Sequence, residues 1–157
     1  MLSRARAAQT LQIQLWPIDR LVPYVRNPRR NDAAVDRMCA SIREFGFKIP
    51  CLVRSDGEVV DGDLRLKVAR KLALTEVPVI LCDEWTPTQV KAFRLLVNRS
   101  AAWAHLDEEL LSLQLQELNE LDFDLSLTGF EPPEIDDLLL LPDDDEKANA
   151  EIGRAHV

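Results

Sequence analysis

The chain has 157 residues, 46% of them hydrophobic, and a formal net charge of −8 at pH 7. This length suits one domain with an appendage, and the composition is apolar enough to form a core. No apolar run approaches the roughly 18 residues that a membrane-spanning helix needs. The first ten residues also lack the apolar region of a signal peptide. We therefore expect a cytoplasmic protein with no membrane partner.

The net charge hides an asymmetry between two parts of the chain. Residues 1–100 contain 17 Lys and Arg against 11 Asp and Glu, whereas residues 101–157 contain 2 against 16. A basic part followed by an acidic extension favours a polyanionic partner for the basic part. Three cysteines lie far apart without a metal-binding spacing, which predicts buried, reduced thiols.

Strand and helix signals alternate from the N-terminus onward. Residues 11–18 ("LQIQLWPI") alternate in polarity and predict a strand, and the Pro-containing basic stretch 21–32 predicts a loop. A helix follows with one apolar face, an N-cap at Asn31 or Asp32, and Gly46 at its end.

The middle of the chain predicts a hairpin and a basic helix. Short strands at 48–54 and 58–60 flank an Asp56-Gly57 turn. The helix that follows places its basic residues largely on one side. Its expected apolar side is formed by Leu64, Val68 and Leu72.

The second half predicts one more strand and three helices. The strand covers residues 77–81, and its Pro78 favours an edge strand or a strand start. Residues 86–89 form a capping box with proline at the first helical position. A leucine-rich helix over about residues 107–119, a short acidic helix and a polar linker follow. No helix-turn-helix is assigned here, so sequence-specific DNA reading is not expected.

The last seven residues, 151–157, resemble an in-frame translation of a common sequencing-library adapter. We therefore expect this tail to be non-native and the native gene to continue beyond about Ala150. A genuine but uninformative tail is the alternative.

The joint between the second hairpin strand and the basic helix is the strongest candidate site. A strand, a glycine and a helix in succession present unpaired N–H groups and the positive end of the helix dipole, which suits a phosphate. Gly62 allows close approach, and Arg65 in the first turn can reach phosphate oxygens. Asp61 and Asp63 oppose a bare phosphate unless Mg²⁺ bridges the charges. Spacing alone favours the structural alternative, with Gly62 as a turn residue, Asp63 as an N-cap and Arg65 solvated.

Four stretches in order resemble the ParB/sulfiredoxin superfamily, specifically the ParB-like N-terminal domain, also called the ParB-like nuclease domain. They are "LVPYVRNPR", "SIREFGFKIPCLVR", "GEVVDGDLRLKVARKLALTEVPVIL" and "LVNRSAAWAHLD". The resemblance implies an α/β fold, a small mixed sheet with flanking helices, followed by C-terminal helices. The implied organisation is a flexible N-terminus (1–10), the ParB-like domain (11–105), a helical extension (106–141), and a disordered acidic linker with the tail (142–157).

The resemblance also implies a phosphate or nucleotide site. Partition-type ParB proteins hold CTP with Mg²⁺ in this region, so CTP or another nucleoside triphosphate is the implied ligand, and metal binding would fall to Asp61 and Asp63. For Asn27 and Arg29 the alternative is an exposed basic loop. For Asn98 and Arg99 it is a helix C-cap. The implied binding residues are Gly62, Asp63, Leu64, Arg65, Asn27, Arg29, Asn98 and Arg99.

Three departures limit what the resemblance implies. Leu64 replaces the second arginine of the phosphate motif, which weakens triphosphate binding. Val97 stands where partition proteins carry a Glu, which argues against nucleotide hydrolysis. No cysteine lies within residues 57–72, so sulfiredoxin activity is not expected.

The C-terminal segment resembles the version of this domain fused ahead of DNA methyltransferases in phage and bacterial genomes. It implies a downstream methyltransferase domain that this chain lacks, and no methylase motif is present. We expect DNA to bind through the basic N-terminal two-thirds, and we leave open a homodimer seam among the leucines of 106–121. The alternatives are a nucleotide hydrolase or small-molecule kinase of the same fold, with Asp61 or Asp63 as base, or a ligand-free structural adaptor.

Overall fold

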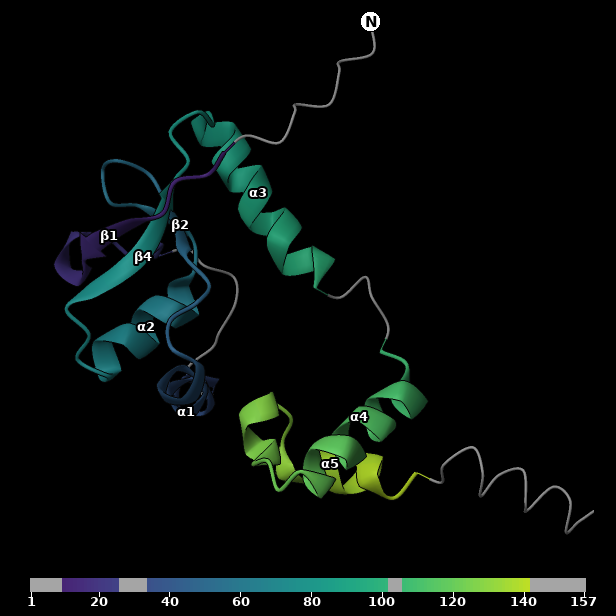
Figure 1. Ribbon diagram of the computed structural model, residues 1–157. Coiled ribbons are helices and arrows are strands. Elements are labelled where there is room, and N and C mark those ends of the chain that lie inside the picture. The colour runs from purple at the N-terminus through teal and green to yellow at the C-terminus, as the bar shows by residue number, and fades with distance from the viewer. Residues whose placement is uncertain (1–9, 26–33, 102–105, 142–157) are drawn as a thin grey trace, which may run out of the picture. The chain divides into compact units, whose positions relative to one another are not determined.

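The computed structural model describes residues 10–25, 34–101 and 106–141. The chain divides into two compact units, Met1–Arg99 and Ser100–Val157 (Figure 1). None of the helices in the described ranges is both long and apolar enough to cross a membrane.

A four-stranded mixed sheet in the order β1-β4-β2-β3 forms the centre of the first unit. The β2 and β4 strands are parallel, whereas β1 and β3 each run antiparallel to their neighbour. The prediction of a small mixed sheet is confirmed, although β1 and β2 are shorter than the polarity pattern suggested. Their bounds are Gln14–Pro17 for β1, Cys51–Val53 for β2, Val59–Asp61 for β3 and Glu76–Leu81 for β4.

Helices α1 (Val35–Phe45) and α2 (Asp63–Lys71) pack against each other, and α2 covers one face of the sheet (Figure 1). The buried residues of α2 are Leu66, Val68 and Ala69. Of the expected apolar side Leu64, Val68 and Leu72, only Val68 is buried, and the other two are half-buried. The reason is that α2 lies between the sheet and α1, and it therefore buries more than one stripe of its surface. The core joins Leu66 and Ala69 to inward-facing strand residues: Trp16, Cys51, Val53, Val59, Val77 and Val79.

The helix boundaries follow local signals closely. Gly46 ends α1 with φ at +81°, as expected, and its N–H donates to the carbonyl of Ile42. The expected N-cap residues, Asn31 and Asp32, lie outside the described residues. Before α3 (Pro87–Ser100), Thr86 and Gln89 exchange the two hydrogen bonds of a capping box, which confirms that prediction.

The position of Pro78 corrects one expectation. β4 is an inner strand with neighbours on both sides, not an edge strand. The pairing with β2 begins at Val79, one residue after Pro78, so Pro78 is paired only with Leu15 of β1. The missing N–H of proline therefore interrupts no ladder on the β2 side.

The chain itself covers the β3 edge of the sheet. Val22 donates its N–H to the carbonyl of Gly57 at 2.8 Å and accepts from the N–H of Val59 at 3.1 Å. This approach requires Gly57, because a Cβ there would lie 2.3 Å from the carbonyl oxygen of Arg20. Gly57 also has φ at +95°, which confirms the predicted Asp56-Gly57 turn.

The second unit contains α4 (Glu108–Glu120), a short 3₁₀ helix (Leu125–Thr128) and α5 (Pro132–Leu139). Asp107 caps α4 by accepting from the N–H groups of the next turn, and α4 packs on α5. Leu115 is buried, and the hydroxyl of Ser112 donates to a carbonyl of α5.

We expect Gly57→Ala to lower the free energy of unfolding of the first unit by about 2 kcal/mol or more, because a clash with the Arg20 carbonyl adds to the unfavourable backbone conformation. Gly129→Ala is the matched control. Gly129 also has a positive φ, +87°, but a Cβ there would meet nothing within 4 Å, so we expect about 1 kcal/mol from the backbone conformation alone. Urea unfolding followed by circular dichroism measures both, and equal losses would contradict the close approach.

Candidate site at the joint of β3 and α2

The N-terminus of α2 follows β3 directly and has no side-chain cap. Gly62 is the N-cap residue, with φ at +117°, and its carbonyl accepts from the N–H of Leu66 at 2.9 Å. Asp63 is the first residue of the helix rather than its cap, and it pairs with Lys67 at 3.7 Å. No side chain therefore caps the N–H groups of the first turn, which lie at the positive end of the helix dipole.

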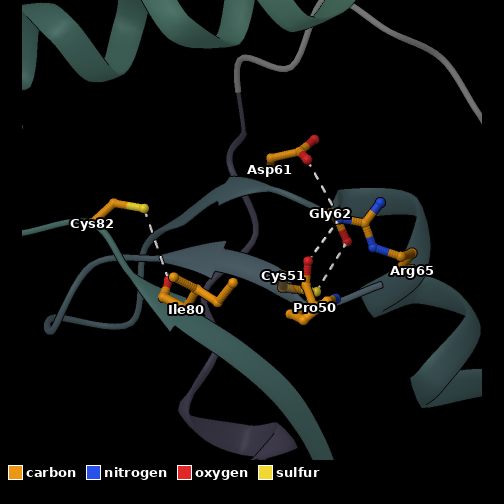
Figure 2. Close-up of polar contacts among 7 residues, drawn as sticks. All are labelled: Pro50, Cys51, Asp61, Gly62, Arg65, Ile80 and Cys82. Carbon is orange, nitrogen blue, oxygen red and sulfur yellow. Dashed lines mark hydrogen bonds and ion pairs between the residues drawn. The ribbon is translucent and has the colours of Figure 1, made fainter. Parts of the chain in front are cut away.

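The protein itself occupies the space beside Gly62 (Figure 2). A Cβ at this position would lie 2.7 Å from the sulfur of Cys51 and 3.2 Å from Nη2 of Arg65. Cys51 is fully buried, and burial raises the pKa of its thiol, although the Arg65 guanidinium lowers it in part. Gly62 is therefore required by internal packing and by its left-handed backbone, whether or not a ligand approaches.

Arg65 is part of the fold and not a solvated side chain. Its Nη2 donates to the carbonyl of Pro50 at 3.1 Å and pairs with the Asp61 carboxylate at 3.4 Å (Figure 2). The side chain is only 19% exposed, and Nε is buried without a partner among the described residues. The guanidinium thus joins the start of β2 to the end of β3 and retains an unpaired N–H at the helix start.

The acidic residues at the joint each face a cation of α2: Asp61 faces Arg65, and Asp63 faces Lys67. Within the described ranges, no group of three or more His, Cys, Asp or Glu is arranged to hold a metal ion. A Mg²⁺ ion at this joint would therefore need further oxygen ligands from a bound phosphate.

The remaining predicted site residues fall into two groups. Asn27 and Arg29 lie outside the described residues. Asn98 is half-buried and Arg99 exposed near the end of α3, which runs on to Ser100, and no described hydrogen bond or ion pair joins them to Gly62 or Arg65. Leu64 and Val97 are both half-buried.

Arg94 of α3 is the structural residue that the sequence did not reveal. Its side chain is 8% exposed, and Nη2 donates to the carbonyl of Val59 at 2.8 Å and to the Glu58 carboxylate at 3.0 Å. The guanidinium lies over the ring of Tyr24, 3.6 Å from its centre. Arg94 thus joins α3 to β3 and to Tyr24. A single arginine in an amphipathic helix carries no local signal for such a role.

Replacing Arg94 with Ala should lower the free energy of unfolding by about 2 kcal/mol, because it removes charge-assisted hydrogen bonds and leaves Glu58 without its partner. The matched control is Lys91→Ala, an exposed residue one turn earlier, for which we expect a change within about 0.5 kcal/mol. The ring resonances of Tyr24, the only tyrosine of the chain, should shift in Arg94→Ala alone. Unchanged Tyr24 signals would contradict the stacking.

Comparison with known proteins agrees with this fold. The family model of the ParB N-terminal domain matches residues 3–98, and that of the ParB-methyltransferase HTH domain matches residues 109–155. The ParB-like nuclease domain-containing protein YnaK of Escherichia coli is 32% identical over 83 residues, which are 52% of this chain and 95% of that protein. The probable chromosome 2-partitioning protein ParB of Deinococcus radiodurans is 33% identical over 125 residues, 76% of this chain and 39% of that protein.

One solved structure shows the same fold. It is the C-terminally truncated chromosome-partitioning protein ParB from Caulobacter crescentus complexed with CTP-gamma-S. Its TM-score is 0.68 at 21% identity, with 92% of this chain and 89% of that chain covered.

The second match corrects an expectation. The family model assigns a helix-turn-helix region to residues 109–155, so the view that none follows the core is wrong. Clustered basic residues are a common sequence signal of a DNA-binding motif. The described part of this region, residues 109–141, contains no Lys or Arg. The chain spans less than half the length of the D. radiodurans partition protein. It belongs to the ParB N-terminal domain family, and a region that matches the ParB-methyltransferase HTH domain follows that domain.

Proposed function

We propose that the chain is a DNA-associated module that binds a nucleotide through its phosphates at the N-terminus of α2. One observation carries this proposal: the uncapped helix start at Gly62 lies beside the guanidinium of Arg65. Backbone N–H groups at a helix start and an arginine are the donors that phosphate binding uses. The C. crescentus relative is complexed with CTP-gamma-S, which makes a cytidine triphosphate the first ligand to test.

The residues present suit a phosphate better with a divalent cation than without one. The hydrogen bond of Arg65 to Pro50 and its pair with Asp61 both use Nη2, and its Nε is buried without a partner among the described residues. The carboxylates of Asp61 and Asp63 repel a bare phosphate. They are also the oxygen ligands that Mg²⁺ prefers when phosphate supplies the others. Nucleotide binding is therefore expected to depend on Mg²⁺.

We assign the site to binding rather than to hydrolysis. Val97 cannot act as a base, and the carboxylates at the joint, Asp61 and Asp63, are both ion-paired. The match to the ParB-methyltransferase HTH domain supports a role beside a DNA methyltransferase, and the partition relatives support a role in DNA segregation. In either setting the module positions DNA for other machinery.

The matched pair Arg65→Ala and Arg70→Ala tests the site. Both arginines belong to α2 and donate to a backbone carbonyl, Arg65 to Pro50 and Arg70 to Leu21 at 3.2 Å. Each variant removes a similar hydrogen bond, but only the first removes a donor at the helix start. Calorimetric titration of CTP and ATP, with Mg²⁺ or with EDTA, should show binding weakened about tenfold or more in Arg65→Ala, because a hydrogen bond to a charged group contributes roughly 1.5–3 kcal/mol. Arg70→Ala should bind like wild type.

Thermal unfolding of both variants checks that they fold, and a phosphate-release assay should detect no hydrolysis. Absence of nucleotide binding by the wild-type chain would leave the structural adaptor as the function. A nucleotide affinity of Arg65→Ala equal to that of the wild type would show that the nucleotide binds elsewhere on the chain.

The basic first unit should supply the interactions with DNA. Anisotropy of a labelled duplex titrated at several salt concentrations should show affinity falling steeply with salt. The double variant Arg43→Ala, Lys48→Ala should reduce that slope by about 1 for each phosphate that these side chains neutralise in the wild type. Both residues are exposed in the first unit. Glu108→Gln in the acidic unit is the control and should leave the slope unchanged; a slope that changes in the control alone would assign DNA binding to the second unit.

A further inference from the structure

The outward side of α4 carries a row of exposed leucines. Leu110, Leu113 and the C-cap residue Leu121 are 59%, 48% and 77% exposed, and we call them the leucine row. Together with Glu117 they follow one another at intervals of three and four residues, which places them on one side of the helix. Large apolar side chains gathered on one exposed face commonly mark a surface that binds another molecule.

The opposite side of α4 belongs to the core of the second unit. Leu115 is buried there, and the Ser112 hydroxyl donates to the carbonyl of Leu138 in α5. α4 and α5 pack against each other along this side (Figure 1). The leucine row therefore takes no part in holding the two helices together, and α5 leaves it exposed.

The surface around the leucine row is acidic. Glu117 lies within the row, and exposed Glu120 lies beside it, directly before Leu121. Residues 106–141 contain 11 Asp and Glu and no Lys, Arg or His, so no cation within these residues balances them. A surface of this charge attracts cationic partners and repels polyanions.

Charge disfavours the other occupants of this face. A DNA duplex and an anionic lipid surface carry the same sign of charge as the unit. A second copy of the face would place Glu117 and Glu120 of one chain against acidic residues of the other. The segment that follows, residues 142–150, has four acidic residues and no large apolar side chain, so its composition suits neither the leucines nor the glutamates.

We propose that the outward side of α4 binds a basic amphipathic helix of a partner protein. The apolar side of that helix packs on the leucine row, and its Lys or Arg residues pair with Glu117 and Glu120. A single helix face buries less than a standard interface of ~1,600 Å², so the affinity is modest and falls with salt. The region that matches the ParB-methyltransferase HTH domain thus binds a protein through α4.

A synthetic helix tests this surface on the full chain. The probe is a labelled amphipathic peptide of about 15 residues, long enough to form a helix, with leucines on one side and lysines flanking them. One control peptide has the same composition in scrambled order, and a second has glutamate at every lysine position. Fluorescence anisotropy should show the probe binding about tenfold or more tightly than the scrambled peptide, because only the probe gathers its leucines on one side. The glutamate peptide should not bind.

Matched leucine variants locate the contact. Leu113→Gln removes the middle of the leucine row, and we expect it to weaken binding of the probe about tenfold. Leu140→Gln is the control, because Leu140 is 81% exposed but belongs to the end of α5. Its affinity for the probe should stay within about twofold of the wild type. Circular dichroism checks that both variants fold. Wild-type affinity in Leu113→Gln, or equal binding of the probe and the scrambled peptide, would overturn the proposal.

A second pair of variants separates local pairing from the overall charge of the unit. Glu117→Gln and Asp137→Asn each remove one negative charge, but only Glu117 lies in the row. The salt dependence of probe binding should fall in Glu117→Gln and stay as in the wild type in Asp137→Asn. Equal effects of the two would show diffuse attraction without docking and would contradict the proposal. Leu113→Gln should leave binding of a labelled DNA duplex unchanged, and a loss there would assign the leucine row to DNA instead.

Discussion

The close approach between Gly62 and Cys51 fixes where α2 begins relative to the sheet, and the candidate site depends on it. Only a residue without Cβ fits against the buried sulfur, and only glycine adopts the left-handed backbone there without strain. This placement brings the first turn of α2 against the start of β2, where Arg65 reaches the carbonyl of Pro50. The uncapped helix start and the guanidinium are thus consequences of one packing constraint.

Half-buried Arg65 and buried Arg94 organise the first unit in similar ways. Arg65 links α2 to β2 and β3, and Arg94 links α3 to β3 and Tyr24. Each keeps a buried Nε without a partner among the described residues. Because an unpaired buried donor is costly, these are the positions at which a ligand oxygen or a water would contribute most. The Nε of Arg65 belongs to the first turn of α2, at the positive end of the helix dipole. The Nε of Arg94 belongs to the packing of α3 against β3.

The two units differ in charge. Residues 106–141 contain 11 Asp and Glu and no Lys, Arg or His, although the family model assigns this region to a helix-turn-helix domain. This described part therefore supplies no side-chain cation to a phosphate backbone. In the proposed binding of DNA, the salt-dependent share of the affinity would come from the basic first unit, in which Arg and Lys outnumber Asp and Glu.

Local signals in the sequence determined the order of strands and helices, the turn at Gly57, the end of α1 at Gly46 and the capping box before α3, because each depends on residues close in the chain. The ordered boxes also identified the family and the joint at Gly62. Tertiary structure alone decided that Arg65 is tied to Pro50, that Arg94 is buried against Val59, that Leu66 and Ala69 face the sheet, and that Pro78 lies in an inner strand. These contacts join residues 15 or more positions apart or depend on which strand lies beside another, and short-range periodicity contains no information about either.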